Sequence, residues 1–216
     1  MTSFDCFIFD FDGTLARSEG AYSAAFSHTI RRHTGQIIDE AEFREYWNLT
    51  PQEVLRRYGE ATLDDLLLSF EEHYYANHHL HLIAYEGIIE ALDLLNRRAA
   101  HLAIVSLKPR RAGELELDIT GLAGHIELAI WGDDVDNPKP EPDGVLRALR
   151  HFDANPQRTL VIGDSPSDIL MGQRAGTRTA AALWSGVNRE RLMSHAPDHL
   201  FDSPQDLIRM VGNPNE

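Results

Sequence analysis

Asp10-Phe11-Asp12-Gly13-Thr14-Leu15 closes an apolar run, residues 4–9, whose pattern predicts a buried strand. Because side chains two positions apart on a strand share a face, the two aspartates should point the same way at its carboxyl end, where α/β sheets bind ligands. A second apolar run, residues 159–163, is also followed by two acids, Asp164 and Asp168. Close carboxylates repel one another unless a cation lies nearby, and hard divalent cations prefer oxygen ligands. The two runs therefore predict a divalent metal site between two strand ends.

The composition is typical of a folded, soluble protein. The chain has 216 residues, 43% of them hydrophobic, which is enough for one well-packed core and a small second domain. Its formal net charge is -14, whereas surfaces that bind nucleic acids or anionic membranes need clustered lysine and arginine. We therefore expect neither a nucleic acid nor a membrane as a partner.

Two further features predict a cytoplasmic location. The single cysteine, Cys6, lies inside the first predicted strand, where it cannot form an internal disulfide and should be buried and inert. No run approaches the ~20 apolar residues of a membrane span, and the first residues lack the basic region of a signal peptide.

Residues 16–81 are predicted to form an inserted, all-helical cap domain. Apolar residues recur at helical spacing from Tyr22 to His33 and again from Leu63 to Tyr74. Between these runs, Thr50-Pro51-Gln52-Glu53 supplies the capping residue, the first-turn proline and the glutamate that typify a helix start. Because helices inserted after a single strand are typical of a cap, residues 1–15 and 82–216 are assigned to the core domain.

Beyond residue 82 the pattern alternates between helices and strands, which is typical of a parallel sheet. Continuously apolar strands such as Leu160-Val161-Ile162 indicate that helices cover both faces. The predicted fold class is therefore α/β, with a doubly wound, Rossmann-like core. The predicted strands are residues 101–106, 127–131, 159–163 and 178–183, and the helices between them lie near 87–98, 110–118, 145–152 and 166–175.

Four polar loops follow strands of this sheet and should converge at one edge: residues 10–14, 106–108, 138–143 and 163–168. Through these loops the chain resembles the haloacid dehalogenase superfamily of hydrolases over essentially its whole length. It is most similar to the phosphoglycolate-phosphatase and pyrophosphatase-like members with a small helical cap. The resemblance implies a Mg²⁺-dependent phosphatase that hydrolyses a small phosphorylated metabolite, phosphoglycolate-like or a sugar phosphate, through an aspartyl-phosphate.

The first loop carries the residues that the resemblance makes catalytic. In that family the first aspartate of the motif is the nucleophile, which here is Asp10. Asp12 would be the general acid and base that protonates the leaving oxygen and later activates water. Gly13 would let the backbone turn closely around phosphate, and Thr14 beside it is a candidate substrate contact. The alternative, a simple strand-ending turn, does not account for the match of the other three loops.

The second and third loops are expected to bind the phosphoryl group. Ser106 matches a family hydroxyl that binds phosphoryl oxygens together with the following backbone N–H. The family often has asparagine next, but Leu107 offers only its backbone donor at this position. Lys139, held between prolines, would neutralise charge on the nucleophile and the transferring group. For Lys108, contact with substrate and exposure to solvent are both open.

The fourth loop implies the metal site. The resemblance makes Asp164 a ligand of Mg²⁺ beside Asp10 and the backbone carbonyl of Asp12, and oxygen-only ligands favour Mg²⁺ over zinc. Asp168 is the remaining candidate metal residue. The serine three positions before it and the proline that follows that serine make Asp168 equally a helix-capping acid, and the two roles can coexist.

Arg57 is the candidate substrate-binding residue of the predicted cap. Together with Arg56 it lies opposite the apolar face of the helix that begins after Thr50, where family members often place specificity residues. A solvated basic face is the alternative.

Several functions stay open beside the phosphatase. Inorganic pyrophosphatase and a β-phosphoglucomutase-like mutase share the same core, and a non-catalytic phosphate-binding or interaction module is an alternative of another class. A dehalogenase is disfavoured because the chain keeps Asp12 and Asp164. A Schiff-base phosphonate hydrolase is excluded because residues 16–96 contain no lysine. A monomer and a homodimer are both compatible with the sequence.

Overall fold

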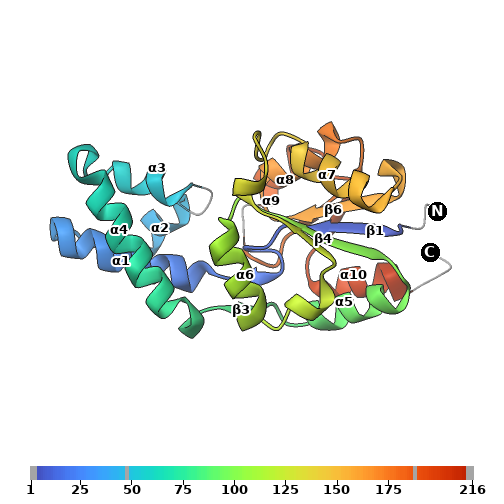
Figure 1. Ribbon diagram of the computed structural model, residues 1–216, viewed down its shortest axis with the longest axis horizontal. Helices are drawn as coiled ribbons and strands as arrows, with labels where there is room; N and C mark the ends of the chain where they lie inside the picture. Colours follow the sequence, from blue (N-terminus) through green and yellow to red (C-terminus); the bar gives the residue numbers. More distant parts are fainter. Residues whose placement is uncertain (1–3, 47–48, 187–188, 213–216) are drawn as a thin grey trace. The chain divides into compact units, whose positions relative to one another are not determined.

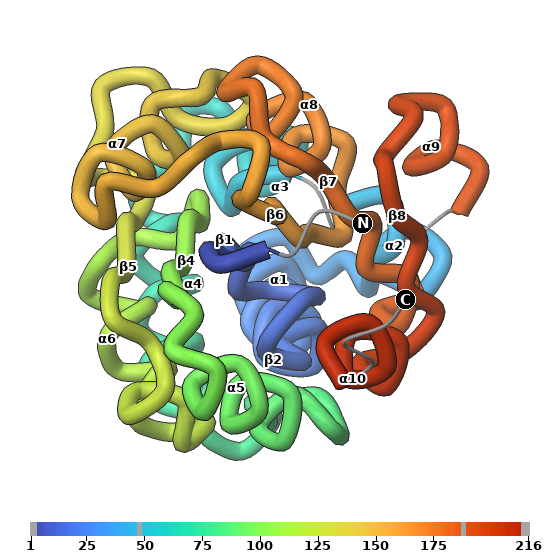
Figure 2. Tube along the Cα trace, turned by 90° about the vertical axis from the view of Figure 1, so that its right-hand side faces the viewer, coloured from blue at the N-terminus to red at the C-terminus, as the bar shows by residue number. Residues whose placement is uncertain are grey.

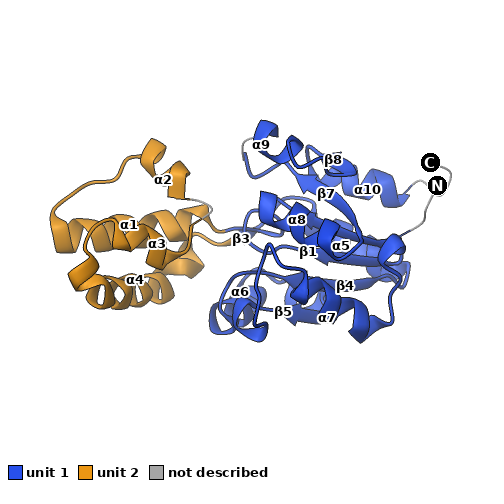
Figure 3. Cartoon of the chain, turned by 90° about the horizontal axis from the view of Figure 1, so that it is seen from above, with its two compact units in different colours: residues 1–17, 83–216 blue, residues 18–82 orange. Residues whose placement is uncertain are grey.

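A computed structural model describes residues 4–46, 49–186 and 189–212 of the chain. The chain forms two compact units, of which unit 1 comprises residues 1–17 and 83–216 and unit 2 comprises residues 18–82 (Figure 3). These limits lie close to those predicted for the core and the cap. That each unit is an independent domain stays a prediction.

Unit 1 contains a six-stranded parallel sheet, which confirms the predicted α/β fold class (Figure 1). The strand order is β5-β4-β1-β6-β7-β8, so β1 runs through the middle of the sheet with β4 and β6 on either side. Phe9, at the end of β1, is paired with Ile104 and Ile162. The strands are β1 (Cys6–Phe9), β4 (His101–Val105), β5 (Leu128–Ile130), β6 (Thr159–Gly163), β7 (Arg178–Ala182) and β8 (His199–Phe201).

Helices cover both faces of this sheet, as a doubly wound fold requires. α7 and α8 lie on one face, and α5 and α10 lie on the other (Figure 2). Under α7 and α8, Ile8 from the central strand packs with Val145 and Met171 in one buried apolar cluster. The helices of unit 1 are α5 (Ile88–Arg97), α6 (Arg110–Ile119), α7 (Asp143–Phe152), α8 (Pro166–Arg174), α9 (Arg189–Met193) and α10 (Pro204–Gly212).

Cys6 is fully buried in β1, and burial raises the pKa of its thiol to about 11. This agrees with the inert thiol that the sequence predicts. Within the described ranges, no helix has the length and apolar character that crossing a bilayer would need.

Unit 2 is helical, but its first helix begins later than the predicted limit of residue 16. Ala16 and Arg17 instead form β2, which pairs antiparallel with β3 (Ile83–Ala84), so the two chain crossings run side by side as a short ladder in unit 1. Inside unit 2, Phe26 packs on Phe70 with ring centroids 4.7 Å apart. The helices are α1 (Glu19–Thr34), α2 (Glu40–Tyr46), α3 (Pro51–Arg56) and α4 (Leu63–Asn77).

The start of α3 confirms the predicted capping box. The Thr50 hydroxyl accepts a hydrogen bond from the Glu53 backbone N–H at 3.3 Å, and the Glu53 carboxylate accepts one from the Thr50 backbone N–H at 2.7 Å. Two donors at the helix start are thereby satisfied by one pair of side chains.

Candidate active site

The carboxyl ends of three neighbouring strands bring the predicted polar loops together in unit 1. Asp10 follows β1, Ser106 follows β4, and Asp164 follows β6. The backbone joins the ends of β1 and β6, because the Asp10 N–H donates to the Ile162 carbonyl at 2.9 Å. The predicted convergence at one sheet edge is therefore present.

Lys139 bridges two of the predicted acids. Its Nζ lies 2.8 Å from Asp10 Oδ1 and 2.5 Å from Asp168 Oδ1, and its side chain is only 3% exposed. Burial alone would lower the pKa of Lys139, but the Asp10 and Asp168 carboxylates outweigh burial and hold the pKa above its ordinary value. The amine therefore faces Asp10 in its charged form, as charge neutralisation requires.

The pKa of Asp10 is raised by burial and by the neighbouring carboxylates. Burial, followed by the charge of Asp168, raises the pKa of Asp10 to about 6, although Lys139 opposes the rise. Asp12 adds a smaller repulsion from the same loop. Lys139 therefore does not offset the combined effect of burial and of the neighbouring carboxylates on the pKa of Asp10.

Asp10, Asp164 and Asp168 form a group that could hold a metal ion. One carboxylate oxygen from each lies within 4.8 Å of the others, and Asp164 and Asp168 are buried. All three offer oxygen, which fits a hard cation such as Mg²⁺. Three of the four predicted metal residues thus lie together. Asp12 was predicted to act through its backbone carbonyl, and that contact stays a prediction.

Asp168 both belongs to this group and caps a helix. Its Oδ1 contacts Lys139, and its Oδ2 accepts hydrogen bonds from the Ser165 N–H at 3.0 Å and the Ser165 hydroxyl at 2.6 Å. The Ser165 hydroxyl in turn accepts from the Asp168 N–H, which completes a capping box at the start of α8. Asp168 therefore holds Lys139 and caps α8, and a direct contact of Asp168 with the metal stays a prediction.

Two glycines make room for the acids. Gly13 has a φ of 75°, and a Cβ added there would lie 2.1 Å from Asp164 Oδ2. At Gly163 an added Cβ would lie 2.2 Å from Asp168 Cγ. Heavy atoms do not approach this closely, so a side chain at either position would displace a carboxylate. The close backbone approach predicted at Gly13 is thus an approach to Asp164.

Lys108 is buried, so the interpretation that it faces solvent is wrong. Its Nζ lies 3.2 Å from Asp12 Oδ1 and 2.7 Å from Glu116 Oε2, and its side chain is 0% exposed. The side chain turns inward because carboxylates of the first loop and of α6 both attract the amine.

The remaining predicted substrate contacts lie in the same loops. Ser106 is buried, and its hydroxyl accepts a hydrogen bond from the Lys108 backbone N–H at 3.4 Å. The Leu107 side chain is exposed. The Thr14 hydroxyl is buried and has no hydrogen-bond partner among the residues described. Their contacts with substrate stay predictions.

Two side chains of this site were missed in the sequence. Ser185, after β7, donates to Asp164 Oδ2 at 3.1 Å, and Trp184 donates through Nε1 to the Thr14 carbonyl at 3.0 Å. The Trp184 ring also meets the edge of the Tyr85 ring, 6.5 Å between centroids. No motif marks this segment. Only the order of the strands, which places β7 beside β6, could have indicated it.

Arg57 lies at the end of α3 in unit 2, where it is exposed. Its guanidinium lies 5.2 Å from the centre of the Tyr46 ring, while Arg56 pairs with Glu60 at 3.0 Å. A role for Arg57 in substrate binding stays a prediction.

Comparisons with known proteins match nearly the whole chain. The family model described as haloacid dehalogenase-like hydrolase matches residues 7–182. Pyrophosphatase PpaX of Oceanobacillus iheyensis is 32% identical over 206 residues, which cover 95% of this chain and 96% of that protein. A predicted phosphoglycolate phosphatase from Haemophilus somnus is 20% identical with a TM-score of 0.85, covering 97% of this chain and 99% of its own. CbbY from Rhodobacter sphaeroides, solved with phosphate, is 24% identical with a TM-score of 0.79, covering 94% and 96%.

Gly13→Ala should weaken Mg²⁺ binding by about 10- to 100-fold, because the new Cβ would displace Asp164. Gly176→Ala is the matched control, since its φ is also 75° but nothing lies within 4 Å of an added Cβ. Both variants should lose about 1 kcal/mol of stability to the backbone conformation. Calorimetric titration measures the binding, and equal Mg²⁺ affinity in the two variants would contradict the assignment of Asp164.

Mg²⁺ affinity should fall as the pH drops through about 6, the pKa to which burial raises Asp10. Below that pH a proton competes with the cation for the carboxylate, at up to about tenfold in affinity per pH unit. In the metal-free protein the sign for stability is opposite. A raised carboxyl pKa means that the folded state binds the proton more tightly, so this group opposes folding fully above about pH 6 and progressively less as the pH falls from 6 toward the ordinary pKa of 3.8.

Titrations at pH 5, 6 and 7.5 measure this dependence. Asp5→Asn, which removes an exposed carboxylate paired with Arg158, is the control and should leave the affinity and its pH profile unchanged. A pH-independent affinity in the unmodified protein would show that Asp10 does not bind the cation.

Proposed function

The chain belongs to the haloacid dehalogenase-like hydrolases, and we propose that it is a Mg²⁺-dependent phosphatase acting on a small phosphorylated metabolite. The observation that carries this proposal is the pairing of Asp10 with Lys139, 2.8 Å apart, inside a cluster of carboxylates. A carboxylate beside a buried cation at the end of the central strand is suited to attack on an anionic substrate.

In the first half of the reaction, an Asp10 carboxylate oxygen attacks phosphorus, and the bond from phosphorus to the leaving oxygen breaks. Asp12 gives its proton to that oxygen, so the leaving group departs as an alcohol. In the second half, a water oxygen attacks the aspartyl-phosphate while Asp12 takes a proton from the water. The bond between Asp10 and phosphorus then breaks, which releases inorganic phosphate and regenerates both carboxyl groups.

The surrounding residues have binding roles in this proposal. Ser106 and the Leu107 N–H bind phosphoryl oxygens, and Gly13 and Thr14 form the turn beside the phosphate. Lys139 neutralises charge on Asp10 and on the transferring group.

The acids of the cluster would hold the cation. Asp10 and Asp164, with the backbone carbonyl of Asp12, are the proposed ligands of Mg²⁺, and Asp168 holds Lys139 beside them. When bound, Mg²⁺ supplies positive charge that orients the phosphate and screens its repulsion from Asp10.

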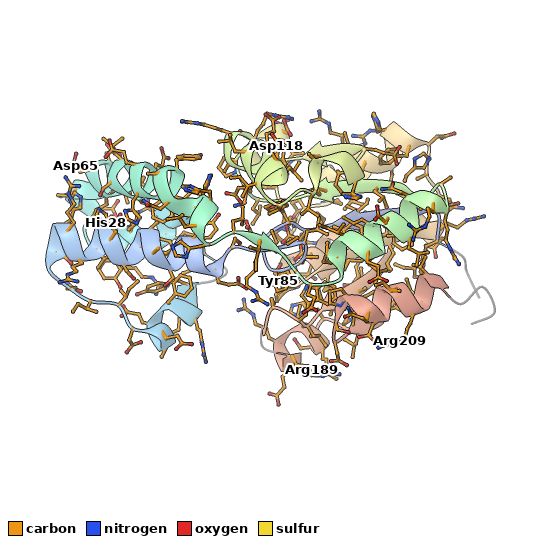
Figure 4. The ribbon with its side chains drawn as sticks, turned by 90° about the horizontal axis from the view of Figure 1, so that it is seen from below. His28, Asp65, Tyr85, Asp118, Arg189 and Arg209 are labelled. Carbon is orange, nitrogen blue, oxygen red and sulfur yellow. The ribbon has the colours of Figure 1, made fainter. Side chains whose placement is uncertain are left out.

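Inorganic pyrophosphate is a second candidate substrate, because a relative 32% identical to the chain is named a pyrophosphatase. Arg17 supports an anionic leaving group, since it is an exposed cation shortly after the first loop. Its guanidinium lies 5.2 Å from the centre of the ring of Tyr85, which is labelled in Figure 4. A phosphate leaving group can depart as an anion and needs less proton donation than an alkoxide does.

Asp10→Asn should lower phosphate release by more than about three orders of magnitude on every substrate, because the amide cannot replace the nucleophilic carboxylate. Phosphate release is measured from phosphoglycolate, sugar phosphates and pyrophosphate, with Mg²⁺ and with a chelator. Asp5→Asn serves as the control for loss of a carboxylate outside the site and should retain full activity.

The pattern of substrates separates the two candidates. Selective release from phosphate esters supports the metabolite phosphatase, whereas selective release from pyrophosphate supports the pyrophosphatase. Full turnover by Asp10→Asn, or turnover that persists with chelator, would contradict the proposed mechanism.

A further inference from the structure

Lys108 is a buried cation placed between two carboxylates. Its Nζ lies 2.7 Å from Glu116 Oε2 and 3.2 Å from Asp12 Oδ1, and the side chains of both Lys108 and Glu116 are 0% exposed. The amine also lies 5.6 Å from the centre of the Phe11 ring. Apolar and anionic groups thus surround the lysine, and one of them is the acid to which proton transfer is assigned.

The backbone around Lys108 is held in place from the neighbouring strand. The Ser106 N–H donates to the Ile130 carbonyl at the end of β5, and the Gly132 N–H donates to the Lys108 carbonyl, both at 3.0 Å. A Cβ added to Gly132 would lie 2.4 Å from the Leu107 carbonyl oxygen, so the two loops pack without space between them. The backbone from which the Lys108 side chain extends is therefore well fixed.

Lys108 and Lys139 are the only lysines in the chain, and they repeat one arrangement. Lys139 joins Asp10 to buried Asp168, and Lys108 joins Asp12 to buried Glu116. Asp10 and Asp12 are thus each paired with a buried lysine, and each lysine contacts a second buried carboxylate as well. The charge of a buried cation that a second carboxylate keeps in place attracts the carboxylate on its other side and so favours one direction for it.

We propose that Lys108, anchored by Glu116, is the positioning residue of Asp12. Its charge attracts Oδ1 of Asp12 across 3.2 Å and so leaves the other carboxylate oxygen to face the leaving oxygen of the substrate. This inference rests on the proposed function, because it needs Asp12 as the proton donor. It assigns Lys108 no contact with substrate, since the amine already lies between two carboxylates.

A positioning role for Lys108 predicts different effects on two substrates that differ in their leaving group, whereas a structural or substrate-binding role predicts the same effect on both. In the first half of the reaction an alkyl phosphate needs its leaving oxygen protonated, whereas p-nitrophenyl phosphate releases a stable anion and needs little proton donation from Asp12. Loss of positioning should therefore slow the first substrate much more than the second. Loss of stability or of a phosphate contact should slow both alike.

The test compares Lys108→Met with the wild type on p-nitrophenyl phosphate and on the alkyl phosphate that the wild type hydrolyses fastest. We expect kcat/KM, which reports the steps up to departure of the leaving group, to fall about 100-fold on the alkyl phosphate and less than about threefold on p-nitrophenyl phosphate. Asp12→Asn should show the same pattern. Asp12→Asn/Lys108→Met should be no slower than Asp12→Asn alone, because the lysine acts through that aspartate.

Two further variants control for folding. Lys108→Met leaves Glu116 buried without its cation, so Lys108→Met/Glu116→Gln removes both charges at similar volume and should unfold at a temperature close to that of the wild type. This double variant carries the test if the single variant does not fold. Arg158→Met, which breaks an exposed ion pair with Asp5, should change neither substrate's kcat.

Equal slowing of the two substrates, or additive effects of Lys108→Met and Asp12→Asn, would overturn the positioning role. If Asp12→Asn slows the alkyl phosphate selectively and neither Lys108 variant does, the inference fails while the proposed function stands. A wild type without activity on either substrate, or an Asp10→Asn variant with full turnover, overturns the proposed function and this inference with it.

Discussion

Repulsion among buried carboxylates is the constraint on which the site depends. Asp10, Asp164 and Asp168 offer oxygens within 4.8 Å of one another, and burial together with Asp168 raises the pKa of Asp10. Lys139 reduces that repulsion, and Gly13 and Gly163 leave the space that the carboxylates occupy. Much of the local sequence around the strand ends thus serves to hold like charges together at the edge of a sheet.

The sequence predicted the parts of this arrangement that depend on local pattern. The β1 and β6 runs, their acids and the capping serine of α8 are each visible within about ten residues. The position of Lys108 was not, because its partner Glu116 lies eight residues further on in α6, and no local pattern shows that the two side chains meet. Ser185 was not predicted for a similar reason, since its hydrogen bond to Asp164 depends on the order of strands in the sheet.

For the fold too, features set by local sequence were predicted, and features set by contacts between distant segments were not. Apolar runs indicated five strands of the parallel sheet and the helices between them, whereas β8 (His199–Phe201) has only one fully apolar pair of residues and was not predicted. β2 and β3 are shorter still, and they form because the two chain crossings pair with each other. All the described acids and lysines of the site belong to unit 1, so the chemistry can be argued from that unit alone.

The burial of Lys108 and Lys139 also determines how fast amine-reactive reagents modify the lysines of the protein. Lysine side chains usually cover protein surfaces, but here the chain has two and both are buried beside carboxylates. Acylation of a lysine therefore requires the strand ends around the site to open first. The rate of lysine labelling in the native protein thus reports the rate of that local opening, because no surface lysine contributes to the signal.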